Sequence, residues 1–360
     1  MKKKLPRFII SFFCFALVFS IILGAAAFAF DPQNMYRWNE KGVRIYNPRF
    51  SAAGSIMNYD YDTAIIGSSM VQTFNADTFA ENFNCKPLKI TLGGIFVKEI
   101  LYVYDAAQKA DKAKRYFVNV DLHKLAAQNR IYSSSGRFPK YMFNSGIFSQ
   151  LQYLLGYETW FCFMPMDIAL SASRLFWKHV PSSVKKSIAE NTDINLMSKW
   201  DNSKIPGREK LIEDFRNNVK NFDEGEDSSH ISDHAVENVE EFMNFLLEPL
   251  DDDEELIIYF PAYSILYWAD KSDIQIETFF EMREFFVEIA DRYPNVTVLD
   301  TQGIEEINDL DLYSDATHYG KTLCENIEKN LANGSYVATG ESIKISSDFI
   351  KKSREKYTSS

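Results

Sequence analysis

Strand-like and helix-like segments alternate along most of the chain, and this alternation constrains the fold more than any other feature of the sequence. The apolar runs of strand type lie at residues 62–69, 87–94, 114–122, 255–263 and 295–301. Such alternation is typical of βαβ units, which form a parallel sheet with helices on both faces. We therefore predict an α/β fold in three layers, α/β/α, with a mainly parallel sheet over residues 60–335 and a C-terminal tail over residues 336–360.

A long stretch between about residues 128 and 232 interrupts the alternation. It is rich in aromatic residues and has the pattern of short helices packed over the sheet. A connection of this length must have structure of its own. Two interpretations are open: a cap that forms the roof of a substrate site, or a helical insertion without a role in binding.

The first thirty residues have the pattern of a membrane anchor. A basic flank at residues 1–7 precedes an uncharged, apolar run at residues 8–30. As a helix rising about 1.5 Å per residue, this run would be roughly 34 Å long, which is enough to cross a bilayer. The basic flank is expected to stay in the cytoplasm, so that a juxtamembrane segment at residues 31–59 and the soluble domain lie on the extracytoplasmic side. The alternative is a cleaved signal peptide, because residues 27–29, Ala-Phe-Ala, have the small-x-small pattern of a signal-peptidase site.

Charge and cysteine content exclude several classes of function. The formal net charge is −11, whereas nucleic-acid binding normally needs a basic face, so no nucleic-acid partner is expected. The four cysteines have no CxxC spacing, which argues against a zinc site and against a redox pair. His230, Asp233 and His234 have the helical spacing of a metal site, but no third cluster supports them. We therefore expect no metal and no cofactor.

Two short polar motifs follow predicted strands and are expected to meet at the same edge of the sheet. Gly67, Ser68 and Ser69 end the first strand, and Asp315 lies three residues before His318 beyond the last strand. At this spacing a carboxylate can hold an imidazole ring whose other nitrogen takes a proton from a serine hydroxyl. The edge formed by the carboxyl ends of parallel strands is also where α/β proteins bind ligands. The alternative for the two serines is structural, because serine often caps a following helix.

The segments IIGSS after the first strand, TLGG after the second and DATH near the C-terminus resemble three motif blocks of the SGNH/GDSL hydrolase superfamily. The Gly-Ser-Ser form with an N-terminal anchor looks more like the membrane-anchored branch, which includes the D-alanyl transfer protein of teichoic acid synthesis and the alginate O-acetyltransferase-like proteins. By this resemblance Ser69 is the nucleophile, His318 the general base and Asp315 the residue that orients His318. The backbone N–H groups of Ser69 and Gly94 would form the oxyanion hole, Gly94 being chosen by its spacing to Glu99.

The chain departs from the family in the third motif block. Many members end the third strand with Gly-x-Asn-Asp, whereas here the segment reads YFVNVDLHK. Two interpretations of Asn119 are open: an oxyanion donor, or a hydrogen-bonded strand residue that leaves Asp121 at the strand end. After the fourth strand, Tyr263, Tyr267 and Trp268 follow at the same sheet edge and are candidates, with Asp121, for binding substrate. The alternative is that these aromatic residues belong to the core.

The resemblance implies an exported, membrane-anchored serine esterase or O-acyltransferase that acts on cell-envelope or secreted polysaccharide through an acyl-serine intermediate. Its partners would be an acyl donor and a glycan acceptor, with a multi-span membrane O-acyltransferase as a further candidate that hands over the acyl group. Acyl transfer through serine needs no cofactor. Two alternatives remain: a catalytically inactive assembly or carbohydrate-binding protein of the same fold, and a lipid ester hydrolase.

Overall fold

The chain divides into two compact units, each formed by two segments. We call Met1–Tyr59 with Pro139–Asp193 the anchor unit, and Asp60–Phe138 with Ile194–Ser360 the α/β unit. The computed structural model describes residues 4–38, 48–127, 138–185, 205–221, 231 and 234–358.

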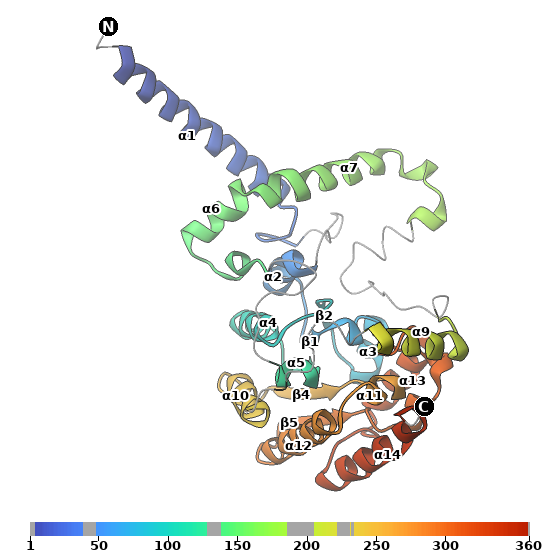
Figure 1. Ribbon diagram of the computed structural model, residues 1–360. Helices are drawn as coiled ribbons and strands as arrows, with labels where there is room; N and C mark the ends of the chain where they lie inside the picture. The colour runs from blue at the N-terminus through green and yellow to red at the C-terminus, as the bar shows by residue number, and fades with distance from the viewer. Residues whose placement is uncertain are drawn as a thin grey trace. The chain divides into compact units, whose positions relative to one another are not determined.

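A five-stranded parallel sheet forms the centre of the α/β unit (Figure 1). Its strands are β1 (Thr63–Gly67), β2 (Pro87–Thr91), β3 (Arg115–Asn119), β4 (Glu255–Phe260) and β5 (Val296–Asp300). They lie in the order β2-β1-β3-β4-β5, and every neighbouring pair is parallel. Their side chains are mostly buried, as is usual for parallel sheets. The predicted strands and the α/β class are confirmed.

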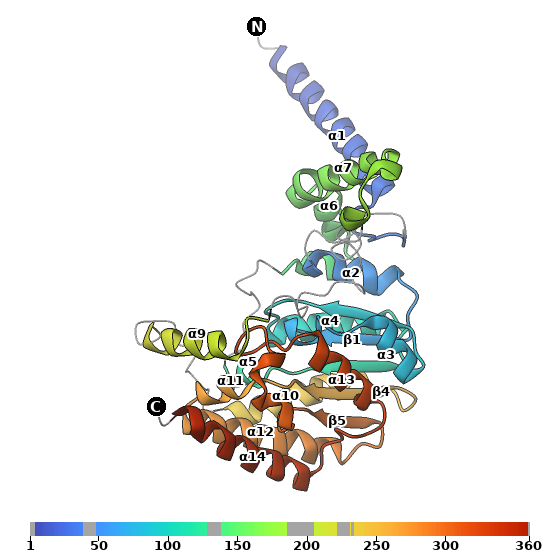
Figure 2. The same ribbon diagram turned by 90° about the vertical axis from the view of Figure 1, so that its right-hand side faces the viewer.

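Helices follow the strands in the predicted alternation. The described helices of this unit are α3 (Ala76–Phe83), α4 (Val97–Lys109), α5 (Leu122–Ala126), α9 (Arg208–Asn221), α10 (Ala235–Leu247), α11 (Ile265–Ala269), α12 (Asp273–Ala290), α13 (Lys321–Leu331) and α14 (Gly340–Thr358). Helix α10 contacts α4 and α12, whereas α3 contacts α13 (Figure 2). The helices that connect the strands therefore form two groups, one around α10 and one around α3.

The C-terminal residues form a long helix where the sequence predicted a tail. Helix α14 contacts α11 and α12. Arg283 of α12 is fully buried and donates hydrogen bonds to Asp300 at the end of β5 and to Ser346 and Ser347 of α14. The sequence analysis did not predict this docking, because α14 is largely polar. Its buried apolar side chains are Ile343 and Ile350, and the hydrogen bonds from Arg283 add to their packing.

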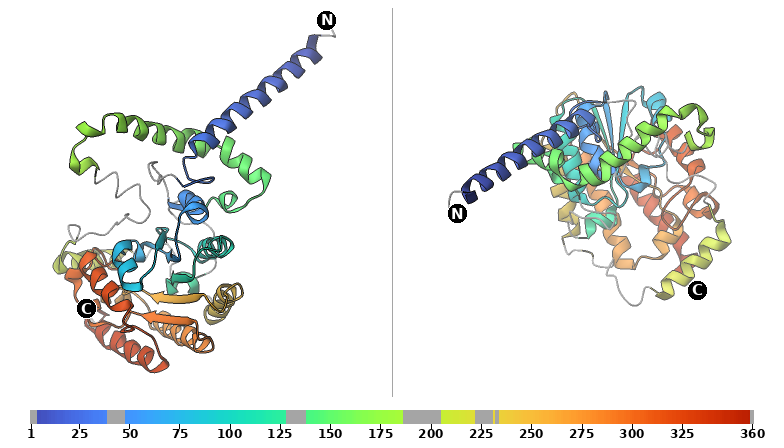
Figure 3. Two further views of the ribbon diagram at one scale, coloured as in Figure 1. Left: turned by 180° about the vertical axis from the view of Figure 1, so that it is seen from behind. Right: turned by 90° about the horizontal axis from the view of Figure 1, so that it is seen from above.

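The anchor unit begins with helix α1 (Lys4–Phe30), in which Arg7–Phe30 is long and apolar enough to cross a membrane. The buried carboxylate of Asp31 follows it and accepts the backbone N–H groups of the next turn at 2.8 to 3.0 Å. Figure 3 shows α6 and α7 beside the C-terminal end of α1. The other described elements are α2 (Pro48–Asn58), the 3-10 helix η2 (Lys140–Phe143), α6 (Ile147–Leu155), the π-helix η3 (Glu158–Phe163), α7 (Met164–Leu175) and the 3-10 helix η4 (Trp177–His179).

The long insertion is divided between the two units. We expected residues 128–232 to pack over the sheet, and short helices are indeed present. Residues 139–185, however, belong with the N-terminal segment, where Met142 and Tyr153 pack with Ala53 in a common core. Residues 205–221, which include α9, belong to the α/β unit. The physical reason is that the aromatic insertion completes an apolar core that the juxtamembrane segment alone is too short to bury.

Asp300→Ala is predicted to destabilise the protein by about 3 to 5 kcal/mol, because it leaves the guanidinium of Arg283 buried without its counter-charge. Thermal unfolding of the full chain in detergent, followed by circular dichroism, measures this loss. Glu277→Ala is the matched control: it removes an exposed ion pair of α12 with Lys351 of α14, and is expected to cost under about 1 kcal/mol. Equal losses in the two variants would contradict the structural role of the buried pair.

Candidate active site

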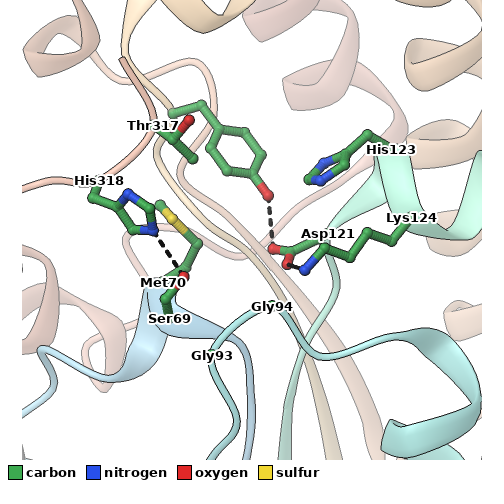
Figure 4. Close-up of a pocket in the computed structure, with 10 residues that line it drawn as sticks. Ser69, Met70, Gly93, Gly94, Asp121, His123, Lys124, Thr317 and His318 are labelled. Carbon is green, nitrogen blue, oxygen red and sulfur yellow. Dashed lines mark hydrogen bonds and ion pairs between the residues drawn. The ribbon is translucent and has the colours of Figure 1, made fainter. Parts of the chain in front are cut away.

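The strand order places a crevice at the carboxyl ends of β1 and β3. From β1 the chain moves outward to β2 and then crosses back to β3 on the other side of β1. In α/β sheets such a reversal separates the adjacent loops and is where ligands bind. A cavity of about 400 Å³ lies at this position (Figure 4). It is lined by Ser69, Met70, Gly93, Gly94, Asp121, His123, Lys124, Tyr263, Thr317 and His318.

Ser68 and Ser69 have different roles. The N–H and the Oγ–H of Ser68 both donate to Oδ1 of Asn119, at 3.0 and 2.9 Å, and the side chain of Ser68 is buried. Of the two interpretations of Asn119, the structure therefore supports the hydrogen-bonded strand residue. Asn119 ends β3 and does not line the cavity. Gly67 makes this possible, because a Cβ there would lie 2.7 Å from that of Asn119. Ser69 instead begins a 3-10 helix, η1 (Ser69–Val71), and lines the cavity.

Ser69, His318 and Asp315 form a continuous hydrogen-bonded chain. The Oγ atom of Ser69 lies 2.8 Å from Nε2 of His318, and Nδ1 of His318 lies 2.8 Å from Oδ2 of Asp315. Burial raises the pKa of the Asp315 carboxyl, but hydrogen bonds and charge from His318, with the N–H of Thr317, hold it below its usual range. Ionised Asp315 favours the tautomer of His318 that carries its proton on Nδ1. The other ring nitrogen then faces Ser69 as a proton acceptor.

A tight loop carries both Asp315 and His318. The Asp315 carboxylate accepts the backbone N–H of His318 at 2.8 Å, and the N–H of Ser314 donates to the carbonyl of His318 at the same distance. The hydroxyl of Tyr319 donates to the carbonyl of Met70, the residue after Ser69. This bond joins the loop that carries His318 to the turn that carries Ser69, across most of the length of the sequence.

The turn after β2 brings Gly93 and Gly94 to the cavity between Ser69 and Asp121 (Figure 4). A backbone hydrogen bond of 2.9 Å closes this turn. Gly94 has a φ of +64°, a left-handed conformation that residues with a Cβ rarely adopt, so glycine is required here. Gly94 therefore stays the candidate for the second backbone donor of an oxyanion hole.

Charged and aromatic residues form the wall of the cavity that faces Ser69 (Figure 4). Asp121 accepts a hydrogen bond from the Tyr263 hydroxyl at 2.7 Å and pairs with Lys124 at 3.2 Å. Burial opposes ionisation of Asp121, but the charges of Lys124 and His123 and the bond from Tyr263 lower its pKa to about 2. Burial lowers the pKa of His123 to about 4, against the attraction of Asp121. At neutral pH this wall presents a carboxylate, an ammonium group and a neutral imidazole.

Sequence reasoning placed only Asp121 and Tyr263 on this wall and missed His123 and Lys124. The sequence did contain a signal for these two residues, because the segment DLHK follows β3 at the same sheet edge as the other motifs. Tyr263 lines the cavity as predicted.

Tyr267 and Trp268 do not line the cavity, so the core interpretation applies to these two residues. The ring of Tyr267 stacks behind Tyr263 with centroids 4.2 Å apart, and its hydroxyl lies 3.2 Å from Nδ1 of His123. Trp268 is fully buried against Phe280 of α12. Tyr267 therefore touches the site only through its neighbours.

Part of the motif with metal-like spacing, His230 and Asp233, lies outside the described residues. Among the residues that the structure describes, no three His, Cys, Asp or Glu side chains are grouped so that they could hold a metal ion.

No protein-family model matches this chain, and no curated protein matches its sequence.

His123→Gln is predicted to flatten the dependence of stability on pH between about 4 and 6.5. In the wild type the folded chain holds His123 neutral down to a pKa of about 4, whereas the unfolded chain binds a proton near pH 6.5. Stability therefore falls as the pH drops through this window, and the variant lacks that contribution. Thermal unfolding of both proteins at a series of pH values measures the difference. An unchanged slope in the variant would argue against a buried neutral imidazole.

Proposed function

We propose that this protein is a serine esterase or O-acyltransferase of the SGNH/GDSL type, with Ser69 as the acyl-accepting nucleophile. The observation that carries the proposal is the hydrogen-bonded chain from Ser69 through His318 to Asp315 at the mouth of a cavity. The two motifs lie 249 residues apart in sequence, and their side chains nevertheless meet at hydrogen-bonding distance. A serine that only caps a helix would have no need of an oriented imidazole.

The reaction follows from these positions. Oγ of Ser69 attacks the ester carbonyl while Nε2 of His318 takes its proton, and ionised Asp315 stabilises the imidazolium that forms. The backbone N–H groups of Ser69 and Gly94 stabilise the oxyanion, and loss of one such donor typically costs about 10²- to 10³-fold in rate. His318 then protonates the departing alcohol. In the second half, water or a sugar hydroxyl gives its proton to Nε2 of His318 and takes the acyl group, and His318 returns that proton to Oγ of Ser69 as the acyl–serine bond breaks.

The fold supports this assignment beyond the three residues. Crossover connections between parallel strands are almost always right-handed. With the order β2-β1-β3-β4-β5, this rule assigns the α10 group and the α3 group of helices to opposite faces of the sheet, which is the three-layer arrangement expected from the resemblance. The IIGSS, TLGG and DATH segments all contribute residues to one cavity.

The character of the cavity favours a short or polar acyl group and a glycan acceptor. Asp121, Lys124 and His123 line the wall that faces the nucleophile, and these groups suit hydroxyl-rich ligands. The same polar wall argues against a lipid ester hydrolase, because a long acyl chain needs an apolar tunnel. The intact hydrogen-bonded chain argues against an inactive binding protein.

Helix α1 fits the role of an N-terminal membrane anchor. The basic flank before it indicates an extracytoplasmic α/β unit, where envelope or secreted polysaccharide would be the acceptor. A multi-span membrane O-acyltransferase that delivers the acyl group remains the candidate partner of such an anchored enzyme.

Labelling with a fluorophosphonate, which bonds only to an activated serine, is expected to mark the full chain at Ser69. The label should disappear in Ser69→Ala and in His318→Ala. Ser68→Ala is the matched control: its hydroxyl is buried against Asn119, so labelling should persist even if stability falls. A folded wild type that takes no label, or a label that survives in Ser69→Ala, would overturn the proposal.

Asp315→Asn is expected to reduce kcat on p-nitrophenyl acetate by on the order of 10³- to 10⁴-fold with little change in KM, because the amide no longer favours the required tautomer of His318. Asp311→Asn changes an exposed carboxylate of the preceding segment that does not line the cavity, and kcat should stay unchanged. Equal rates for wild type and Asp315→Asn would show that His318 needs no carboxylate.

A further inference from the structure

Large apolar side chains are exposed along the surface formed by α6, η3 and α7 of the anchor unit. Phe148 is 84% exposed and Phe161 70% exposed, although both are phenylalanines in well-formed helices. The segment from 147 to 163 contains one charged residue, Glu158. Soluble proteins rarely expose so many apolar side chains together without a partner. The α6–α7 surface comprises Ile147, Phe148, Leu151, Leu155, Tyr157, Phe161, Ile168 and Phe176.

Helix α6 also has an inner face, and this face is already occupied. Tyr153 is buried in the core of the anchor unit with Met142 and Ala53, and its hydroxyl lies 3.2 Å from Oδ1 of Asp31. Helix α6 therefore carries apolar side chains on two faces, one packed on protein and one exposed. A helix that is apolar all round is typical of burial or of a membrane environment.

The α6–α7 surface is continuous with the surface of α1. Leu155 at the end of α6 packs on α1, where its Cδ2 would lie 3.8 Å from a Cβ placed on Gly24. Gly24 lies six residues before the end of α1, which corresponds to about 9 Å along a helix axis. If α1 crosses a bilayer over its apolar length, Gly24 and the Leu155 side chain beside it lie within the hydrocarbon of the leaflet at the C-terminal end of α1. The exposed face of α6 then meets lipid next to α1.

We propose that the α6–α7 surface is a second membrane-contacting element, immersed in the leaflet that surrounds the C-terminal end of α1. Its occupant is the lipid bilayer. Trp177 and Lys185 at the far end of this region, with the Lys185 ammonium 5.8 Å from the Trp177 ring centroid, are of the types that gather at the membrane–water interface. The inference depends on α1 crossing the membrane and is independent of the chemistry proposed for Ser69.

The test uses the full chain in vesicles of phosphatidylcholine and phosphatidylglycerol, with an environment-sensitive NBD label at Phe148→Cys or Phe161→Cys. The four native cysteines are replaced by alanine in every variant. Phe15→Cys, on the exposed apolar surface of α1, reports that the anchor is inserted. Ile345→Cys is the matched control, because it is an exposed apolar residue of a helix, α14, in the α/β unit. Quenching by nitroxide-bearing lipid is compared with quenching by aqueous iodide.

Labels at Phe148→Cys and Phe161→Cys are expected to emit at shorter wavelength than the label at Ile345→Cys and to be quenched at least twofold more by nitroxide lipid than by iodide. Quenching of these two labels mainly by iodide, as at Ile345→Cys, would overturn the proposal. Shielding from both quenchers would also overturn it, because the surface would then be covered by protein. A label at Phe15→Cys that lipid does not quench would remove the anchor on which the inference depends.

Discussion

The side-chain amide of Asn119 fixes the turn after β1, which carries Ser69. Its oxygen accepts both the N–H and the hydroxyl of Ser68, so the chain leaving β1 can turn in only one direction. This close contact requires the absence of a side chain at Gly67. The turn presents Ser69 to the cavity while Ser68 stays buried. One buried side chain on a neighbouring strand therefore decides which of two adjacent serines is available for chemistry.

Further polar contacts from distant parts of the chain converge on the segment after Ser69. Lys89 of β2 is buried and donates to the carbonyl groups of Gln72 and Phe74 at 3.0 and 2.7 Å. The hydroxyl of Tyr319, in the loop that carries His318, donates to the carbonyl of Met70. These contacts hold the backbone of the segment after Ser69. A fixed backbone keeps Oγ of Ser69 within hydrogen-bonding distance of Nε2 of His318.

The strands and the three residues of the hydrogen-bonded chain could be predicted because both follow from short-range patterns and one topological rule. Apolar runs mark strands, and parallel strands bring their carboxyl ends to one edge of the sheet. Because β3 and β4 lie between β1 and β5, the meeting of Ser69 and His318 also depends on the path of the loop after β5. Docking of α14 was not predicted, because this helix is largely polar and its contacts include hydrogen bonds from the buried Arg283. The pairing of Tyr153 with Asp31 was equally invisible, since it joins residues 122 positions apart without any shared motif.

The division of the chain into two units has a consequence for proteolytic release of the α/β unit from helix α1. Because each unit contains two segments, the chain passes from one unit to the other three times. A protease that cuts after Tyr59 would separate α1 and α2 from the rest, but residues 139–193 would remain covalently attached to the α/β unit and would carry their exposed phenylalanines with them. Separation of the α/β unit from these exposed side chains would require cuts at all three crossings, so a single proteolytic cut does not release this unit alone.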